Sequence, residues 1–381
     1  MHIAVITEYN PFHMGHEYQL SEIRRAFPDA TVTAIMGGIF SQRGEPYITT
    51  PYVRAEAALE CGADLVLELP FPFSSAPAGT FTRAGVEIAA KIGADMLAFG
   101  SECGSIETLK TTIARLDSEE LRDAVERESR AVSKTRTFDK VYKELYGEEL
   151  ASGPNDILAY EYMRAIKSGG YSIEPYTIKR VGDFKSGEGG FPSATSIRQD
   201  IAEHGIDALR GKVPPVAEKV YKKAYDDGLF GADIEKLSSA ILLKLSVPLQ
   251  SDIAYSSDGL LRHIGMAAAR VKSVAELKKL SAAKHCTVSE ISRLILYALF
   301  DVTREDLDAP VYITRIFGAN TRGRAVIRQI KDIEVITKPS SFEKMTPEAF
   351  AQYDKNLLAE RAFALCFEGR YNFLLKSPII K

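Results

Sequence analysis

The chain has 381 residues, 45% apolar and 26% charged, a balance that is typical of compact globular proteins and excludes a disordered or collagen-like chain. No apolar stretch reaches the roughly 18 residues that a membrane span needs. The first residues also lack the pattern of a secretory signal, so we expect a cytoplasmic protein. The four cysteines lie far apart and match neither a disulfide framework nor a zinc site.

Over the first hundred residues, short apolar runs rich in β-branched residues alternate with amphipathic segments. This alternation is typical of βαβ units, in which helices cover a parallel sheet. We expect strands at residues 2–6, 31–36, 64–69 and 95–99. The helices between them are expected at residues 15–26, 51–61 and 80–92.

Residues 105–168 read as helical, with a new helix beginning near Asn155, and a fifth strand is expected at residues 172–178. Beyond about residue 205 the alternation with strands disappears and segments of helical period dominate. The predicted fold class is therefore α/β, with a Rossmann-like parallel sheet followed by a mainly α-helical C-terminal domain. We place the two domains at residues 1–204 and 205–381.

Charge differs between the two halves of the chain. Residues 1–200 hold 21 basic and 29 acidic side chains, and residues 201–381 hold 27 and 22, so the halves carry −8 and +5. This asymmetry suggests that the second half meets a polyanion.

The strongest local signal directly follows the first predicted strand and opens the first helix. It reads Thr7-Glu8-Tyr9-Asn10-Pro11-Phe12-His13-Met14-Gly15-His16. Ligands of a doubly wound sheet bind at this kind of point, where free N–H groups of a helix start favour an anion. Imidazole N–H donors can stabilise the charge that develops as pyrophosphate leaves, so His13 and His16 are predicted to be catalytic. A metal site would need at least a third ligand, and we predict none.

A second signal, Ser193 to Arg198, follows the last predicted strand and opens another helix. Hydroxyl and N–H groups at a helix start suit the β- and γ-phosphates of a nucleotide, and an arginine can pair with them. We therefore expect Ser193, Ser196 and Arg198 to bind phosphates. Taken alone, this segment would be read as an ordinary helix cap.

Together the two motifs resemble those of the nucleotidyltransferase superfamily with a His-x-Gly-His motif. More narrowly, the chain resembles the bacterial tRNA(Met) cytidine acetate ligase family. The matching stretches lie in residues 8–13, 42–46, 64–70, 99–102, 154–158 and 193–198.

The resemblance implies a nucleotidyltransferase sheet and a ligase that uses ATP, with Mg²⁺, to activate acetate as acetyl-adenylate. The acetyl group would then pass to N4 of the wobble cytidine, C34, of elongator tRNA(Met). It also implies that ATP is held by Thr7, Glu8, Tyr9, Asn10, Pro11, Phe12, His13, Met14, Gly15, His16, Glu17, Tyr18, Gln19 and Leu20, and by Gly100, Asn155 and Arg180. Without the resemblance, the last three would be read as a turn glycine, a helix cap and a surface arginine.

The sequence departs from the family pattern at Gly182-Asp183-Phe184, where a Tyr-His-Asp stretch is expected. Binding of tRNA is expected in the second half, and the clustered Arg322, Arg324 and Arg328 are candidates to contact its phosphates. Two other functions stay open at this point. One is a small-molecule adenylyltransferase, and the other is a non-catalytic protein that binds a nucleotide and RNA.

Overall fold

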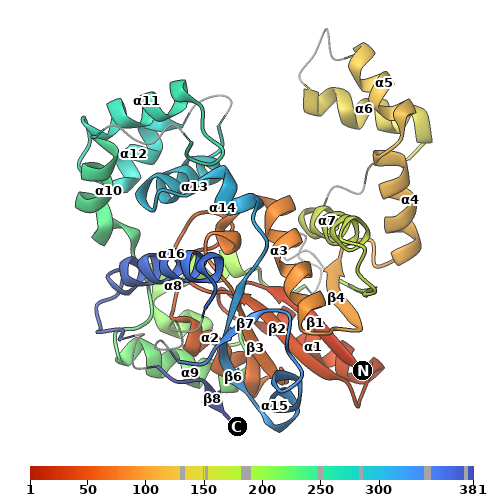
Figure 1. Ribbon diagram of the computed structural model, residues 1–381, viewed down its shortest axis with the longest axis horizontal. Coiled ribbons are helices and arrows are strands. Elements are labelled where there is room, and N and C mark those ends of the chain that lie inside the picture. Colours follow the sequence, from red (N-terminus) through yellow and green to blue (C-terminus); the bar gives the residue numbers. More distant parts are fainter. Residues whose placement is uncertain are drawn as a thin grey trace.

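The computed structural model describes residues 1–128, 134–148, 150, 153–181, 190–247, 252–282, 286–338, 345–372 and 376–381. Within them, eight strands form one sheet in the order β5-β4-β1-β2-β3-β6-β7, and β8 also pairs with β6 (Figure 1). Neighbours among β1 to β5 are parallel, whereas β6 is antiparallel to β3. The strands are β1 (His2–Thr7), β2 (Thr31–Gly37), β3 (Leu65–Leu69), β4 (Met96–Ser101), β5 (Glu174–Lys179), β6 (Ile313–Ala319), β7 (Glu334–Ile336) and β8 (Ile379–Ile380).

Helices account for most of the remaining described residues. They are α1 (Met14–Ala26), α2 (Pro51–Glu60), α3 (Ala78–Lys91), α4 (Ile106–Leu116), α5 (Glu119–Glu128), α6 (Lys134–Tyr146), α7 (Pro154–Ser168), α8 (Ala194–His204), α9 (Pro215–Asp226), α10 (Ser238–Leu245), α11 (Asp258–Ala268), α12 (Val274–Ser281), α13 (Val288–Leu299), α14 (Arg304–Asp308), α15 (Thr321–Ile327) and α16 (Pro347–Ala364). Short 3₁₀ turns lie at η1 (Phe73–Ser75), η3 (Ile206–Leu209) and η4 (Ile234–Leu237).

Both faces of the sheet are buried. In β1, Ile3 and Val5 belong to one apolar cluster and Ala4, which lies between them, belongs to another, as the period of two in a strand requires. Helices α1, α2, α8 and α9 contribute to the first cluster, and α3, α4 and α7 to the second. This is the doubly wound arrangement, in which the carboxyl ends of the parallel strands form one edge.

The predicted elements of the first two hundred residues are confirmed. Strands β1 to β5 correspond to the five predicted strands, and α1, α2 and α3 to the three predicted helices. Helix α7 begins one residue before Asn155, and α8 begins directly after its cap Ser193.

The expectation that strands end by residue 205 is wrong, because β6, β7 and β8 belong to the same sheet as β1. Strand β6 was not predicted because Arg315, a charged residue, lies near its centre. That guanidinium is buried and pairs with Glu360 at 2.7 Å and with Glu68 of β3 at 3.4 Å. Outside these strands, the described part of residues 205–381 is mainly helical. The division of function at residue 204 stays a prediction.

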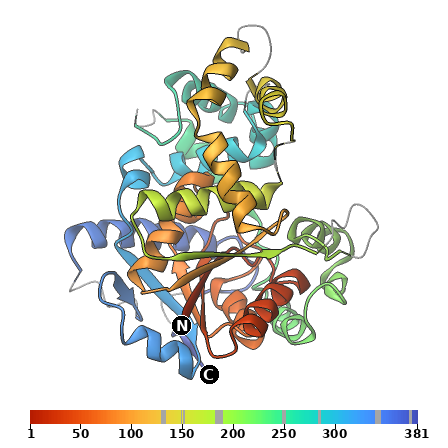
Figure 2. The ribbon, with the colours of Figure 1, turned by 90° about the vertical axis from the view of Figure 1, so that its right-hand side faces the viewer.

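Two groups of helices project from the sheet on the side away from both termini. Helices α5 and α6 form one projection, and α10 to α13 form the other, which we call the helical lobe (Figures 1 and 2). Since β1 begins at the N-terminus, both projections lie beyond the carboxyl edge of the parallel strands. In the described parts of the chain, no helix combines the length and apolarity needed to cross a membrane.

Candidate active site

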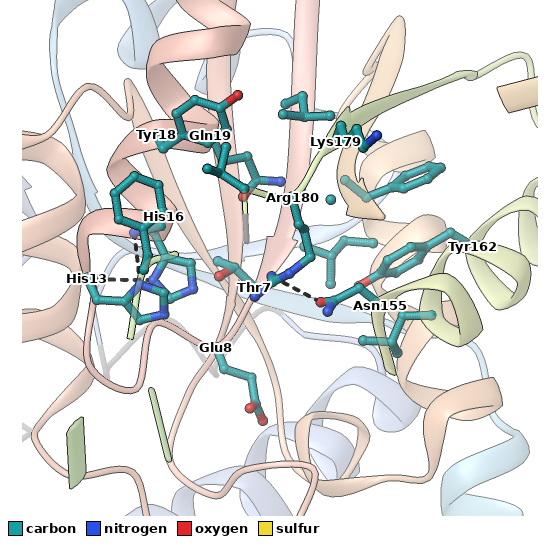
Figure 3. A pocket seen from close by; sticks show the side chains of 18 of the residues that line it. Thr7, Glu8, His13, His16, Tyr18, Gln19, Asn155, Tyr162, Lys179 and Arg180 are labelled. Atoms are coloured by element: carbon teal, nitrogen blue, oxygen red, sulfur yellow. Dashed lines mark hydrogen bonds between the residues drawn. The ribbon is translucent and has the colours of Figure 1, made fainter. Parts of the chain in front are cut away.

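A cavity of about 220 Å³ opens at the carboxyl edge of the sheet, where β1, β4 and β5 end (Figure 3). Its walls come from the end of β1, the start of α1, the ends of β4 and β5, helices α3 and α7, the loop after β2 and the segment before α8. The predicted residues that line it are Thr7, Glu8, His13, Gly15, His16, Tyr18, Gln19, Gly100, Asn155 and Arg180. The structure thus brings together segments that are up to 173 positions apart in the sequence, from Thr7 to Arg180.

The two histidines cap helix α1 reciprocally. His13 is the N-cap, and its Nδ1 accepts a hydrogen bond from Gly15 N at 3.0 Å, while His16 Nδ1 accepts one from His13 N at 3.2 Å. Their rings stack with centroids 3.8 Å apart. Because each Nδ1 accepts, a neutral ring carries its proton on Nε2. The backbone therefore sets the tautomer that offers an Nε2–H donor.

Both rings are held in the neutral state. Burial lowers the pKa of His13 to about 3, with further contributions from the positive charges of Arg180 and Arg198. Burial also lowers the pKa of His16 well below its ordinary value, assisted by His13 and Arg180. Neutral imidazoles can donate hydrogen bonds to phosphate oxygens, but they hold no proton that can be transferred to a leaving group at neutral pH.

Gly15 is required by this cap. A Cβ at Gly15 would lie 2.9 Å from Cε1 and 3.1 Å from Nδ1 of His13, so a larger residue would push the imidazole out of its cap. The His13 ring therefore occupies the space beside the glycine.

Tyr9 fixes the preceding turn. Its backbone adopts a left-handed conformation with φ 45°, which a non-glycine residue adopts at a cost, and its ring is fully buried. The ring contacts Phe12 and His16 edge-on, with both centroid distances 4.8 Å. Phe12 N in turn donates to Tyr221 Oη at 2.8 Å. The buried aromatic residues thus support the imidazoles from behind.

Arg180 and Asn155 lie across the cavity from the histidines (Figure 3). Arg180 Nη1 donates to Asn155 Oδ1 at 3.3 Å, and Asn155 Nδ2 donates to Glu102 Oε1 at 2.6 Å. Glu102 also accepts from the backbone N of Asp156 at 2.8 Å, so it caps helix α7 and orients Asn155 at the same time. This side of the cavity offers a cation and an amide, groups that can hold a ribose or a base.

The start of helix α8 lies outside the residues that line the cavity. Ser193 Oγ accepts from Ser196 N at 3.1 Å and so acts as a helix cap in this ligand-free structure. Arg198 Nη1 donates to the carbonyl of Asn10 at 2.7 Å, which connects α8 to the histidine loop. Arg43 Nη1 donates to Thr195 Oγ1 at 3.3 Å and brings a further cation, which the sequence analysis missed.

The remaining predicted residues of the first loop support the cavity and do not line it. Tyr9, Asn10, Phe12 and Leu20 are buried, and Asn10 Oδ1 accepts from Ile48 N at 2.8 Å. Pro11, Met14 and Glu17 are also absent from the lining. The lining residues that the sequence analysis did not select are Ile6, Gln42, Phe81, Phe99, Leu158, Tyr162, Ile178, Lys179, Val181 and Phe191. Gln42 stands in a stretch that carries the family resemblance, which is a signal that could have identified it.

Arg54 holds the ends of β1 and β2 in place. It is fully buried, and it donates to the carbonyl of Glu8 at 2.7 Å and to the carbonyls of Gly38 and Thr49. Its guanidinium lies 3.9 Å from the centroid of the Tyr47 ring. Burial lowers the pKa of Arg54 to about 10, which leaves it charged at neutral pH.

The arginines predicted to contact tRNA lie far from the cavity in the fold. Arg322, Arg324 and Arg328 are exposed on or next to α15, which follows the end of β6. Because β6 is antiparallel to β3, that end lies at the amino edge of the parallel strands, where Ala319 pairs with Leu65. The cavity is at the opposite edge.

A search of the described residues finds no group of three or more His, Cys, Asp or Glu side chains that could hold a metal ion. Among the described residues that line the cavity, Glu8 is the one acidic side chain. Residues 182–184, where the sequence departs from the family pattern, lie outside the described residues.

Comparison with known proteins identifies the family. Residues 1–374 match the model of the HIGH Nucleotidyl Transferase family. The tRNA(Met) cytidine acetate ligase of Caldanaerobacter subterraneus subsp. tengcongensis is 33% identical, with 100% of this chain and 99% of that protein covered. The protein of the same name from a Thermoanaerobacter species is 31% identical over 96% of each chain.

Solved structures agree. Thermotoga maritima TmcAL bound with alpha-thio ATP has a TM-score of 0.88 and 27% identity, covering 100% of this chain and 99% of that one. The apo structure of the same protein has a TM-score of 0.88 and 28% identity. The fold is the predicted nucleotidyltransferase α/β fold, and the chain belongs to the tRNA(Met) cytidine acetate ligase family of HIGH nucleotidyl transferases.

Proposed function

We propose that this enzyme is an ATP-dependent ligase that activates acetate as acetyl-adenylate and acetylates N4 of C34 in elongator tRNA(Met). The observation that carries the proposal is the pair of neutral imidazoles, each with its Nδ1 already engaged, in a cavity that holds Arg180 and Asn155 opposite them. Family membership supports the substrates, since the relatives are named for this reaction. The helical lobe makes the chain longer than a small-molecule adenylyltransferase requires, which counts against that alternative.

The cavity suggests how ATP lies. The adenosine fits the side formed by β4, β5 and α7, with Gly100, Asn155 and Arg180. The phosphates then extend past the histidine loop towards the start of α8, where Ser193, Ser196 and Arg198 supply donors. In this arrangement Arg198 would exchange the Asn10 carbonyl for a phosphate.

In the first step a carboxylate oxygen of acetate attacks the α-phosphorus of ATP. A new oxygen–phosphorus bond forms, and the bond to the bridging oxygen breaks as pyrophosphate leaves. The Nε2–H groups of His13 and His16 stabilise the negative charge that grows on the phosphate oxygens. Neither histidine takes or gives a proton, which is consistent with their lowered pKa values.

Mg²⁺ is proposed to arrive with the phosphates of ATP. Such an ion needs one or two protein carboxylates at most and keeps several of its waters. The described residues that line the cavity include one carboxylate and no ready-made cage. The protein's own contribution to charge stabilisation is therefore assigned to the histidines and arginines.

Binding of tRNA is proposed to involve residues 205–381, and we propose a cytoplasmic location because that is where a tRNA substrate would be met. The helical lobe stands beside the cavity, because Arg293 Nη1 donates to the carbonyl of Gln42 at 2.9 Å and Gln42 lines the cavity. Exposed cations of the lobe include Arg262, Arg270 and Lys279. Binding by Arg322, Arg324 and Arg328 stays a prediction, and these residues lie at the amino edge of the sheet, opposite the cavity.

The decisive experiment incubates the enzyme with labelled ATP, acetate and elongator tRNA(Met), then identifies the nucleotide products and the modified base. We expect AMP, pyrophosphate and N4-acetylcytidine at position 34, each dependent on acetate. ADP and phosphate as the main products would instead indicate acyl-phosphate chemistry and would refute adenylylation. ATP consumption without acetate or tRNA, with a small molecule as acceptor, would favour the small-molecule adenylyltransferase.

A further inference from the structure

Beside the histidines, the cavity holds a carboxylate whose orientation is fixed. Glu8 Oε1 accepts hydrogen bonds from Gln42 N at 2.8 Å and from Tyr47 Oη at 3.2 Å. Tyr47 is itself buried against Arg54, which also holds the Glu8 carbonyl. Two donors on one oxygen prevent the carboxylate from rotating. The other oxygen, Oε2, accepts no hydrogen bond from any described residue.

Gln42 carries an unpaired hydrogen-bond donor, whereas Glu8 carries an unpaired acceptor. It lines the same cavity, and its Nε2 is a buried donor with no hydrogen-bond partner among the described residues. Leaving a buried amide donor unpaired costs free energy, about 1–3 kcal/mol in general, so such a group in a native cavity calls for an explanation. An unpaired acceptor on Glu8 and an unpaired donor on Gln42 therefore lie on neighbouring residues of one wall.

This pair is unsuited to the two anions of the first step. A carboxylate repels both the phosphates of ATP and acetate, whereas it accepts readily from an amino group. An acceptor next to a donor matches the Watson–Crick edge of cytosine, on which the N4 amino group donates and N3 accepts. Recognition of a flipped base through this edge is common among enzymes that modify bases.

We propose that Glu8 and Gln42 bind the cytosine that is acetylated, with Glu8 Oε2 accepting from N4 and Gln42 Nε2 donating to N3. The assignment rests on the proposed function and names the site of its second substrate. Glu8 was expected, like its neighbours in the loop, to bind ATP, and this proposal assigns it to the second substrate instead. A uracil would present O4 to the carboxylate and N3–H to the amide, and both contacts would be repulsive.

The adenine of ATP also has an amino donor beside a ring-nitrogen acceptor, so it could pair with Glu8 and Gln42 in the same way as cytosine. The position of the adenosine in the cavity decides between the two bases. Gln42 lies in the loop after β2, on one side of β1, whereas Gly100 and Arg180 lie at the ends of β4 and β5, on the other side. The histidines follow β1, between the two. If adenosine occupies the β4–β5 side, the α-phosphate lies at the histidines and the β2 side is left for the nucleophile.

The proposed pair also serves the chemistry of transfer. The N4 atom attacks the carbonyl carbon of acetyl-adenylate, a nitrogen–carbon bond forms, and the bond between that carbon and the phosphate oxygen breaks. AMP leaves with the electrons of that bond. One proton of N4 passes to Glu8 Oε2, which makes Glu8 the general base of this step.

The test compares the two half-reactions in the variant Glu8→Gln. The amide oxygen of the new side chain can still accept from Gln42 N and Tyr47 Oη, so its NH₂ group faces the cytosine. We expect acetate-dependent exchange of labelled pyrophosphate into ATP to stay within about threefold of wild type. Acetyl transfer to tRNA should fall on the order of 100-fold or more, the loss expected for a general base. Glu22→Gln, on α1 and outside the cavity lining, is the matched control and should change neither.

A second variant, Gln42→Met, removes the donor at nearly constant volume. We expect the KM for tRNA to rise several-fold to about tenfold, with little change in pyrophosphate exchange. Binding assays without turnover should show that wild type prefers tRNA with C34 to the same tRNA with U34, and that Glu8→Gln reduces this preference.

Three outcomes would overturn the assignment. Glu8→Gln could slow both half-reactions equally or raise the KM for ATP, which would place Glu8 on ATP or its metal ion. It could slow neither. The C34 preference could also survive unchanged in both variants. If wild type itself forms no acetyl-adenylate or leaves tRNA unmodified, the proposed function fails, and that result is recognisable without any variant.

Discussion

The two edges of the sheet hold polar side chains in very different ways. At the carboxyl edge, the cavity side chains of His13, His16 and Asn155 each have an assigned hydrogen-bond partner, and none of the three is fully exposed. At the amino edge, Arg322 and Arg324 are exposed and contact a backbone carbonyl at 3.4 Å and a hydroxyl at 3.2 Å.

This difference separates a built site from a charged surface. Holding a side chain in one orientation costs conformational entropy, and partners that enforce it prepare the group for a ligand. An exposed arginine that keeps its freedom contributes charge and no fixed geometry. Variants at the carboxyl edge should therefore have large, step-specific effects, and variants at the amino edge should have small ones.

The largest effect is expected for the histidines. In His13→Asn, the shorter amide oxygen can still accept from Gly15 N, but the Nε2–H donor is gone. We expect kcat for adenylate formation to fall roughly 100- to 1,000-fold, the loss typical of one preorganised donor. The thermal midpoint should change little because the cap is kept.

His13→Ala removes both the cap and the donor, so it should match the loss of activity and also destabilise the protein by about 1 kcal/mol. A kcat for either variant within threefold of wild type, at saturating ATP, would contradict the assigned role of His13. A raised KM for ATP with an unchanged kcat would instead indicate that His13 contributes to ground-state binding of ATP.

Arg54 should show the next largest effect, on stability. Arg54→Ala leaves the carbonyls of Glu8, Gly38 and Thr49 without their donor in a buried region. We expect the free energy of unfolding to fall by at least about 3 kcal/mol, since each orphaned buried acceptor costs about 1–3 kcal/mol. Chemical denaturation with a two-state fit measures this loss. Replacement of the exposed Arg328 by Ala is the control, and an equal loss there would contradict the argument.

A smaller effect is expected from pH. Both histidines have folded-state pKa values below the ordinary value of 6.5, about 3 for His13. Below pH 6.5 the unfolded chain therefore binds protons that the folded protein does not, so stability falls as pH falls from 6.5 towards 3 and is fully present above 6.5. The decline should be at most about 1.4 kcal/mol per pH unit for each histidine.

Denaturation curves between pH 7.5 and 5 measure this decline, and the double variant His13→Asn/His16→Asn should reduce it. An unchanged slope in the double variant would mean that other groups cause the acid sensitivity. The same reasoning predicts that kcat shows no loss near pH 6.5 from protonation of these rings in the folded enzyme.

The contrast between edges also explains what the sequence could and could not reveal. Strands β1 to β5 and the histidine loop are encoded locally, as an apolar run followed by a turn and a helix start, and they were predicted correctly. Strand β6 was missed because a charged residue, Arg315, interrupts its apolar pattern. Glu68 and Glu360 neutralise this arginine inside the protein, but they lie far away in the sequence. Gln42 was likewise missed as a lining residue, since nothing local shows that the loop after β2 turns towards the cavity.

The clustered arginines show what a linear pattern leaves open. Three arginines within seven positions indicate local positive charge, but the direction in which β6 runs decides which edge they occupy. Because β6 is antiparallel to β3, they lie opposite the cavity. A tRNA whose anticodon enters the cavity would have to extend around the sheet to reach them.

The smallest effect is therefore expected for the triple variant Arg322→Ala/Arg324→Ala/Arg328→Ala. Each lost phosphate contact should lower the slope of log affinity against log salt by about one unit. We expect a change below one unit for this variant and a larger one for Arg262→Ala/Arg270→Ala/Lys279→Ala in the helical lobe, with ATP affinity unchanged in both. Titrations of labelled tRNA at several salt concentrations measure the slopes. A loss of two or more units from the α15 variant, with none from the lobe variant, would mean that tRNA follows the amino edge and that the lobe serves another purpose.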